Sequence, residues 1–407
     1  MRALLSAWLA ALLLAPAAVR RTSPGGIQAR DADTVRTPAF DAGDYVYSSG
    51  QDGRRPDGTL AEGFNAQTRQ ALENVQGLMA AAGLTMRNVV YMQVYLTNMA
   101  DYANLAEPLR ASFPSDPPAG AVLGVTALAH GSVEINAVAV RDLAGRRPVA
   151  IGGRPGLFAA GILTHDRLFV SAQEGRDPAT RAIPDDPGAQ TDLALDGLRE
   201  VAERAGLTMK HFVFVNPYLT RRIPTQVMNE RYARRFEFGN TPARATIQAS
   251  WLPENAQVEY TGVAVRDLGL RRAVRPKNMA PSPTASPCVF AGQTLYCSAK
   301  SGFIPGPNGG VYASATGVQL RQTMRNQLDN LEEAGMGFSD VVSTTVYLDN
   351  LSDNAEFQAV YREYFSGAPP AQTVVQQIAP ATRFADPKGH YPDLEQMSLI
   401  AVKRAPK

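Results

Sequence analysis

The chain has 407 residues, of which 45% are apolar, and its 40 basic and 38 acidic side chains nearly cancel. This length exceeds what one hydrophobic core usually organises, so two to four units of roughly 100–150 residues are expected. Because the net charge is close to zero and no long run of either sign occurs, a dedicated nucleic-acid-binding protein is not expected.

The N-terminus has the layout of a secretory signal. Arg2 precedes an apolar run from Ala3 to about Leu14, and small residues follow. The alternative is a membrane anchor, but the run is shorter than the ~20 apolar residues that a spanning helix needs. We therefore expect a signal peptide over residues 1–20 and an exported protein, periplasmic or secreted, with no membrane contact after the signal is removed.

A pattern of elements recurs three times along the chain. Each copy begins with a strand that ends in a small polar turn, at 45–51, 168–173 and 295–300. A helix follows, with apolar residues at helical spacing in the first two copies, at Leu72, Val75, Met79 and Ala82, and at Leu195, Leu198, Ala202 and Ala205. Glycines that suit a left-handed helix cap come next, at Gly83, Gly206 and Gly335. A further strand is expected at 88–96, 211–219 and 340–348.

A second helical stretch and a closing hairpin complete each copy, so that the unit is β-β-β-α-β-α-β-β. Pro217 inside its strand predicts an unpaired edge or a bulge there. The copies are placed at 28–143, 148–267 and 275–405. One sheet with two helices on one face leaves its other face uncovered, so three linked α+β copies are expected to bury those faces around a pseudo-threefold axis.

The chain has two cysteines, Cys288 and Cys297. If Gly292 and Gln293 form a two-residue hairpin turn, the cysteines face each other within disulfide range. An oxidising compartment favours the bond. The alternative is two separate thiols that pack as small hydrophobic groups, and it is slightly preferred because the turn type is only inferred.

Several short stretches resemble the RidA (YjgF) family, whose small members assemble as homotrimers around a central β-barrel. The resemblance lies in the S-G-Q-like turn at 49–51, the A-G-L or A-G-M helix ends, the V-Y-L strand ends, and P-A-R at 242–244 with L-P and a glutamate after it. It extends over nearly the whole mature chain, three times. It implies a pseudo-trimer in one chain, with sites in clefts between neighbouring copies.

Many members of that family are enamine and imine deaminases, which convert 2-imino acids to 2-oxo acids and ammonia without a cofactor or metal. Their arginine, which holds the substrate carboxylate, falls on Arg244, but on Gly120 and Gln372 in the other copies. Their water-positioning glutamate falls on Glu259 and Glu134, and becomes Gln396 in the third copy. Other family positions fall on Asn229 and on the serines Ser49, Ser171 and Ser298, whereas a family tyrosine is replaced by Phe158.

The residues themselves agree with part of this assignment. Alternation along 242–251 puts Arg244, Thr246 and Gln248 on one face. Folding this segment against the next strand as a hairpin sets Glu259 opposite Gln248, with Arg244 roughly 13 Å further along. A guanidinium suits a carboxylate, and a glutamate can position water. The alternative is that Arg244 and Glu259 form only a structural ion pair between copies.

The expected site therefore has Arg244 and Glu259 as catalytic residues, with Arg244, Asn229, Ser171 and Thr246 binding the substrate. The function it implies is hydrolysis of 2-imino acids in one competent cleft. The alternatives are a binding module for a small carboxylate and, more weakly, a ribonuclease. The scattered histidines do not indicate a metal site. The third copy has a long insertion at 379–396, which is expected to be a solvated loop.

Overall fold

The computed structural model describes residues 35–403 apart from 153–155, 307–309 and 366. The predicted signal peptide at 1–20 lies outside the described residues. Among those residues, no helix is both long enough and apolar enough to cross a membrane.

The first repeat forms one mixed sheet, in the order β1-β2-β6-β4-β5 with β3 added beside β6. Its strands are β1 (Ala39–Asp41), β2 (Tyr45–Ser48), β3 (Gln51–Asp52), β4 (Val89–Leu96), β5 (Ala119–Gly124) and β6 (Val133–Val140).

The second and third repeats form two further mixed sheets with related strand orders, β11-β10-β13-β9-β8-β7 and β14-β15-β16-β19-β17-β18, and β12 also pairs with β10. The second sheet consists of β7 (Arg147–Val149), β8 (Gly161–Leu163), β9 (Arg167–Glu174), β10 (Phe212–Leu219), β11 (Ala243–Arg244), β12 (Ile247–Gln248) and β13 (Val258–Val265). The third consists of β14 (Arg271–Val274), β15 (Cys288–Ala291), β16 (Thr294–Lys300), β17 (Val341–Leu348), β18 (Ala371–Gln376) and β19 (Glu395–Val402). The predicted α+β class is confirmed, and the third sheet starts slightly before residue 275.

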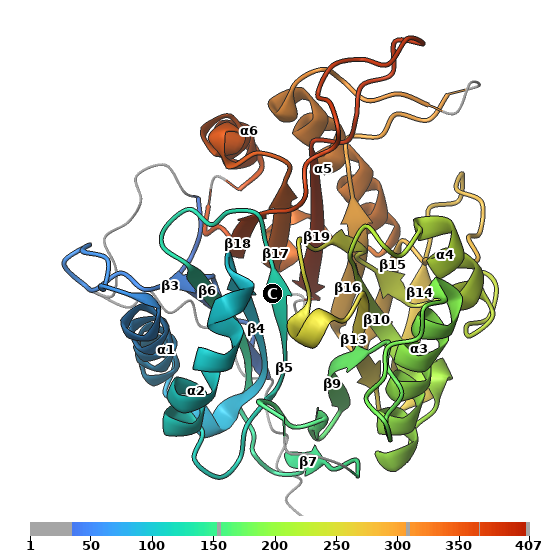
Figure 1. The fold of residues 1–407 in the computed structure, drawn as a ribbon. Helices are drawn as coiled ribbons and strands as arrows, with labels where there is room; N and C mark the ends of the chain where they lie inside the picture. The colour runs from blue at the N-terminus through green and yellow to red at the C-terminus, as the bar shows by residue number, and fades with distance from the viewer. Residues whose placement is uncertain (1–34, 153–155, 307–309, 366, 404–407) are drawn as a thin grey trace, which may run out of the picture.

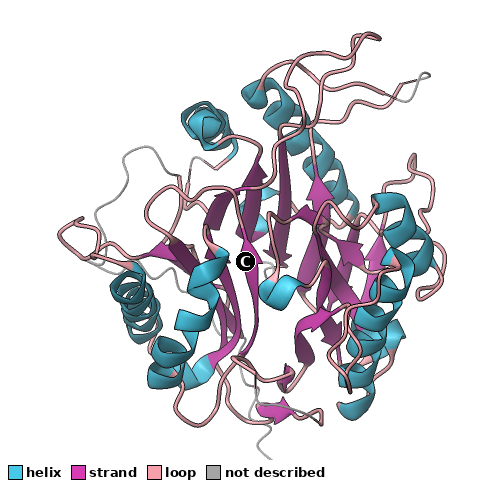
Figure 2. Ribbon diagram, in the orientation of Figure 1, coloured by secondary structure: helices cyan, strands magenta, loops and turns pink. Residues whose placement is uncertain are grey.

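Two helices accompany each sheet and lie on the outside of the molecule, with the strands in the middle (Figures 1 and 2). They are α1 (Phe64–Ala81), α2 (Ala106–Ser112), α3 (Pro187–Arg204), α4 (Thr225–Ala233), α5 (Thr316–Glu333) and α6 (Asn354–Tyr364). Just past the ends of the long helices lie Gly83, Gly206 and Gly335, which have φ angles of 74°, 80° and 70°. These left-handed caps were predicted from the sequence.

The predicted closing hairpin is wrong. β5 pairs parallel to β4 and β6 pairs antiparallel to β4 on its other side, so β5 and β6 are not neighbours. The same holds in the second repeat, where β10 lies between β11 and β13. The reason is that a helix connects β4 to β5, and such a crossover returns the chain parallel to the strand it left.

The three sheets surround a common centre, and their edges meet at only a few backbone hydrogen bonds. Gly50 N donates to Gln372 O at 3.2 Å, and Gly124 N donates to Trp251 O at 3.1 Å. An apolar cluster from all three repeats lies between the sheets and includes Tyr95, Leu123, Tyr218, Ile247, Tyr347 and Val375. The predicted trimer-like arrangement within one chain is present, but no closed hydrogen-bonded barrel is found in the described part of the chain, since the ladders stop at each boundary.

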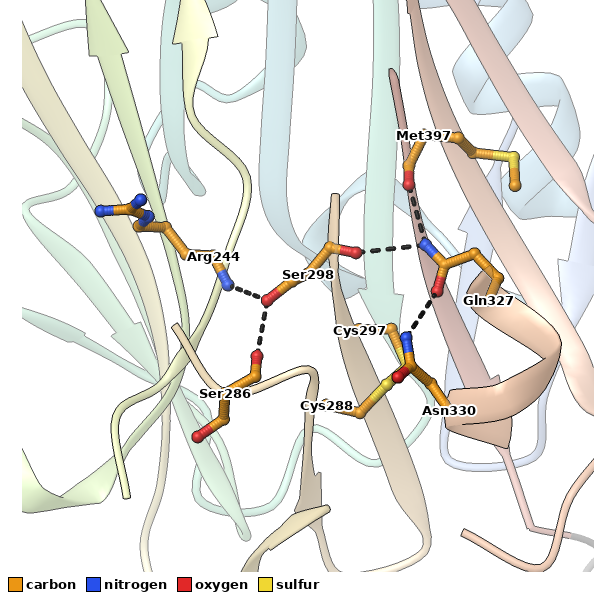
Figure 3. The surroundings of a disulfide bond; sticks show 8 residues. All are labelled: Arg244, Ser286, Cys288, Cys297, Ser298, Gln327, Asn330 and Met397. Atoms are coloured by element: carbon orange, nitrogen blue, oxygen red, sulfur yellow. Dashed lines mark hydrogen bonds between the residues drawn. A yellow bond between two sulfur atoms is a disulfide. The ribbon is translucent and has the colours of Figure 1, made fainter. Parts of the chain in front are cut away.

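The hairpin of β15 and β16 turns at Gly292 and Gln293, as predicted, and pairs Cys288 with Cys297. The two cysteines form a disulfide with a Cα separation of 4.0 Å (Figure 3). The preference for two separate thiols was therefore wrong. The antiparallel register brings the two Cα atoms so close that the sulfur atoms meet.

The insertion at 379–396 is irregular until β19 begins. Phe384 in this loop is 80% exposed. Arg383 anchors the loop to its own repeat, with its Nε 3.1 Å from Asp349 Oδ2 and its Nη2 paired with Asp353.

Candidate functional site

The three boundaries between repeats share one contact, in which a serine hydroxyl accepts a hydrogen bond from the backbone of the neighbouring repeat. The first cleft joins Gly120 N to Ser171 Oγ at 2.8 Å. The second cleft joins Arg244 N to Ser298 Oγ at 2.8 Å. The third cleft joins Gln372 N to Ser49 Oγ at 2.9 Å. The serine of each repeat thus faces the edge strand of the repeat before it, with the third repeat facing the first.

The second cleft contains Arg244 at the edge of its sheet, on β11. Its Nη1 donates to Asn229 Oδ1 on α4 at 2.7 Å. The guanidinium carbon lies 5.1 Å from the centre of the Tyr232 ring. Burial lowers the pKa of Arg244, whose ordinary value is so high that the group stays charged. No acidic side chain in the described part of the chain forms an ion pair with it, so the cleft presents a partly buried cation with spare donors.

The backbone beside Arg244 is irregular because of Pro217 on the neighbouring strand. The parallel ladder between β10 and the edge stops after Val215 and Arg244 and resumes at Tyr218 and Ile247. Pro217 lies in the gap and has no amide hydrogen to donate. Thr246 lies in the same gap, and its buried hydroxyl has no hydrogen-bond partner. The predicted irregularity at Pro217 is confirmed, and Thr246 is close to Arg244 in the chain but outside any strand.

Ser298, and not Ser171, is the serine of the second cleft. Its hydroxyl donates to Ser286 O at 2.6 Å while it accepts from Arg244 N. Gln327 on α5 donates to Ser298 O at 3.1 Å, and the disulfide lies in the same hairpin (Figure 3). The placement of Ser171 beside Arg244 was wrong, because the serine of a repeat faces its predecessor and not its own edge strand.

Glu259 does not lie beside Arg244 either. Residues paired across a ladder share a face, and Arg244 pairs with Val215, which packs in the core under the helices. Glu259 pairs with Tyr218, which belongs to the central cluster between the sheets. The two side chains therefore leave opposite faces of the second sheet. The predicted convergence depended on a hairpin that does not form.

The surroundings of Glu259 belong to the boundary with the first repeat. Burial raises the pKa of Glu259 well above its ordinary value, Glu174 raises it further, and Arg176 lowers it. Its charge also acts on Tyr102, which lies in a short helix of the first repeat, Met99–Leu105. Its Oε2 has no hydrogen-bond partner. Glu259 thus contributes to the first cleft, where the arginine is missing.

The corresponding position in the third repeat is Gln396, which pairs with Tyr347 as Glu259 pairs with Tyr218. By this equivalence Gln396 lies at the boundary with the second repeat, and its Nε2 donates to Gln377 Oε1 at 2.9 Å. The equivalent glutamate of the first repeat, Glu134, pairs with Tyr95 and belongs in the same way to the third cleft. The arginine and the glutamates therefore lie at different clefts, and the cleft with the arginine has an amide in place of the carboxylate.

The first and third clefts are filled. A Cβ atom on Gly120 would lie 2.7 Å from ring carbons of Phe158 and 2.7 Å from Met92 O, so the ring takes the place where an arginine would begin. In the third cleft, Gln358 Nε2 donates to Gln372 Oε1 at 2.7 Å, and Val35 N donates to Gln358 Oε1 at 3.0 Å. The second cleft has only the small Ala285 where the first has Phe158.

The family model for Endoribonuclease L-PSP matches residues 29–141, 153–266 and 277–382. The chain belongs to this family. The predicted family resemblance and the three copies are thereby confirmed. The matches to single relatives span about one repeat of this chain and most of the relative's length.

Among these relatives, rat 2-iminobutanoate/2-iminopropanoate deaminase is 38% identical over 122 residues, which are 30% of this chain and 85% of the rat protein. Protein DfrA of Myxococcus xanthus is 38% identical over 119 residues, 29% of this chain and 88% of its own length. The crystal structure of RidA from Psychrobacter is 36% identical, covers 29% of this chain and 99% of its own, and has a TM-score of 0.25.

No group of three or more histidine, cysteine or acidic residues in the described ranges is arranged to hold a metal ion. Sequence comparison among the copies could identify Arg244 and Asn229, which the fold brings together. It missed Ser298, Ala285 and Gln396 as members of the same cleft. The serine recurs in all three copies, but only the order of the repeats around the axis tells which one meets Arg244.

Proposed function

We propose that the second cleft binds one small carboxylate-bearing molecule and that Arg244 is its anchor. The observation that carries this proposal is a partly buried guanidinium without an acidic partner, oriented by Asn229 at 2.7 Å. Such a group offers two parallel donors to a carboxylate, and the low local polarity strengthens the contact. The other two clefts are closed by Phe158 and by the pair Gln358 and Gln372, so one ligand per chain is expected.

Carboxylate binding has better support than turnover, because the second cleft lacks the expected general base. Gln396 can donate and accept hydrogen bonds, but its amide does not take a proton at working pH. Glu259, which could accept one, belongs to the first cleft. A carboxylic acid bound in the second cleft would therefore have no neighbouring group suited to activate water.

Hydrolysis of 2-imino acids is the second candidate, and it is favoured by the similarity to proteins named 2-iminobutanoate/2-iminopropanoate deaminase. In this reaction water adds to the imine carbon, the nitrogen takes up protons, and the carbon–nitrogen bond breaks to release ammonia and a 2-oxo acid. Arg244 would orient the carboxylate, and Gln396 with Asn229 would hydrogen-bond the water and the nitrogen. No cofactor is needed for these steps.

Calorimetric titration with pyruvate tests the binding proposal. We expect one site per chain in the wild type, and an affinity at least tenfold weaker in Arg244→Ala, since a charge-assisted bidentate contact is lost. The exposed Arg325→Ala serves as the matched control and should bind like the wild type. Equal affinity in Arg244→Ala and the wild type would refute the role of Arg244.

Semicarbazide competition separates binding from hydrolysis. An amino-acid oxidase generates the 2-imino acid, and the protein suppresses semicarbazone formation only if it hydrolyses the imine. We expect weak or no suppression by the wild type and a clear gain in Gln396→Glu, which places a carboxylate in the cleft with Arg244. The gain should vanish in Gln396→Glu with Arg244→Ala. Strong suppression by the wild type that Arg244→Ala abolishes would instead establish the deaminase.

A further inference from the structure

A cavity of about 110 Å³ lies between the three sheets, and none of the cleft residues Phe158, Arg244 and Gln372 lines it. All three sheets contribute to its wall. None of the described residues that line it is charged. It therefore differs in chemistry from the second cleft, and what it binds is independent of the function proposed for that cleft.

The cavity exists because the three repeats differ at equivalent positions of β4, β10 and β17. Tyr91 pairs with Val138, Phe214 with Val263, and Ser343 with Ile400 in the three equivalent ladders. Two of the three positions thus have large rings and the third has a serine. Two residues further along the same strands, Gln93 of the first repeat and Asn216 of the second correspond to Thr345 of the third. The third repeat supplies the small side chains, so the hollow space lies mainly on its side.

One part of the wall is rich in hydrogen-bonding groups. Tyr91 and Tyr218 both donate to Gln93 Oε1, at 2.9 and 3.0 Å. On the side of the third repeat, the cavity is lined by the hydroxyls of Ser343, Thr345 and Ser398. Within the described part of the chain, no side-chain hydrogen bond is found for these three hydroxyls. These groups have donors and acceptors left for a guest.

The other part of the wall is formed by aromatic and aliphatic side chains. The rings of Phe214 and Tyr296 lie 5.7 Å apart, and Tyr47 and Phe169 pack nearby among Val138, Val263 and Ile400. Water cannot form hydrogen bonds to such surfaces, whereas an aromatic ring gains hydrophobic and ring–ring contacts from them. The cavity is therefore ring-lined on one side and hydroxyl-lined on the other.

We propose that this central cavity binds one small, neutral aromatic molecule with a hydroxyl group, of the phenol class. The cavity is of the same order as the ~150 Å³ apolar cavity that admits benzene in an engineered protein. The ring would pack against Phe214 and its neighbours, and the hydroxyl would bond the free hydroxyls of the third repeat. A carboxylate or ammonium is excluded, because the wall offers no counter-charge to offset its desolvation. Burial also raises the pKa of Tyr91, Tyr95 and Tyr347 well above the usual range, which keeps the wall neutral.

The test is binding of phenol to the full chain, measured by ligand-detected NMR and by thermal unfolding. Ser343→Phe copies the residue of the second repeat and fills the cavity, and Thr345→Gln copies the first repeat. We expect phenol to raise the unfolding temperature of the wild type and its affinity to fall at least tenfold in both variants, which should otherwise unfold at or above the wild-type temperature. Ser352→Phe, an exposed position, is the matched control and should bind phenol normally.

Two further ligands define the chemistry. Toluene, which lacks the hydroxyl, should bind more weakly than phenol, and benzoate should not bind at all once Arg244→Ala has removed the carboxylate anchor. If phenol does not bind the wild type, or binds Ser343→Phe and Thr345→Gln as tightly as the wild type, the cavity holds only water and the proposal is wrong. Should Ser343→Phe fail to fold, Thr345→Gln decides the question by the same measurement.

Discussion

At the scale of single residues, the three clefts differ at one position just before the hairpin that faces the neighbouring repeat. It is Phe158 in the first cleft, Ala285 in the second and Arg36 in the third. The phenylalanine ring packs against Gly120 and leaves no room for a larger side chain. The second cleft has the small side chain of Ala285 at this position. In the first cleft, loss of the arginine and filling by the Phe158 ring are therefore coupled, since a ring and a guanidinium cannot share that volume.

A substitution at Gly120 tests this coupling. Gly120→Ala should destabilise the chain by about 1–3 kcal/mol, because overpacking a tight site forces the Phe158 ring and backbone to shift. Urea unfolding measures the difference. Gly337→Ala is the matched control, since a Cβ at Gly337 meets nothing within 4 Å. In the double variant Gly120→Ala with Phe158→Ala, the penalty for the added methyl should shrink; an unchanged penalty would show that Phe158 is not the obstacle.

At the scale of elements, the β15–β16 hairpin holds one wall of the second cleft. Its disulfide joins residues nine apart in the sequence, and Ser298 follows Cys297 directly. Closing a loop of this size in the unfolded chain stabilises the fold by about 2.5 kcal/mol in the chain-entropy model. The hairpin thus couples the stability of the third repeat to the position of the hydroxyl that bonds Arg244.

Removal of the disulfide should therefore affect both stability and binding. Cys288→Ala with Cys297→Ala is expected to lower the unfolding free energy by about 2–4 kcal/mol. Urea unfolding with and without a reductant measures this, and the reductant should leave the double variant unchanged. We also expect weaker pyruvate binding in the variant. Equal stability of the reduced and oxidised wild type would contradict a structural role for the bond.

The start of β19 gives the third repeat a dependence on pH. Glu395 is fully buried, and burial raises its pKa to about 8 from an ordinary value of 4.5. Thr323 Oγ1 donates to one of its oxygens at 2.5 Å, and the other oxygen has no partner. Between those two pKa values the folded state holds a proton that the unfolded state has lost. The contribution of Glu395 to stability therefore falls as pH rises from about 4.5 to about 8.

Glu395→Gln should remove this dependence while it keeps the acceptor for Thr323. We expect the unfolding free energy of the variant to fall less steeply between pH 5 and 8 than that of the wild type, as measured by urea unfolding at several pH values. Glu333→Gln, at an exposed position on α5, should keep the wild-type slope. If Glu395→Gln shows the same slope as the wild type, Glu395 is already ionised in the folded chain.

At the scale of the whole molecule, Arg167 connects all three repeats. It is 3% exposed and pairs with Asp166 of its own repeat. Its Nη1 donates to Tyr296 of the third repeat at 2.8 Å, and its guanidinium carbon lies 4.2 Å from the ring centre of Tyr45 of the first. A homotrimer would place three identical residues in such a position. The fused chain places an arginine between different partners, which orders the repeats.

Arg167→Met should therefore destabilise the chain strongly. Breaking a buried ion pair by removing one partner costs roughly 3–5 kcal/mol, and Asp166 keeps some contact with water, so the lower end is expected. Differential scanning calorimetry gives the change, and Arg167→Met with Asp166→Asn should recover part of it. Arg69→Met breaks an exposed pair with Glu107 and should change stability by less than about 1 kcal/mol. If Arg167→Met also lowers the unfolding free energy by less than about 1 kcal/mol, Arg167 does not link the repeats.

The sequence by itself determined the three copies, the order of their elements, the left-handed glycine caps and the one copy that retains an arginine. These features are local, because periodicity and turn residues act within a few residues of each other. It also brought Asn229 to Arg244 correctly, since both belong to the same repeat and the helix before the edge strand lies beside it.

Only the tertiary structure decided which residues from different repeats share a cleft. Internal similarity shows that Ser171 and Ser298 are equivalent. It does not show in which order the repeats follow one another around the axis, because either order has the same internal similarity. The order places Ser298 and Gln396 with Arg244, and leaves Glu259 with Gly120. The sheet order, with β10 between β11 and β13, also separates Arg244 from Glu259. Strand neighbours and repeat neighbours are set by packing of distant segments, which no short pattern in the chain specifies.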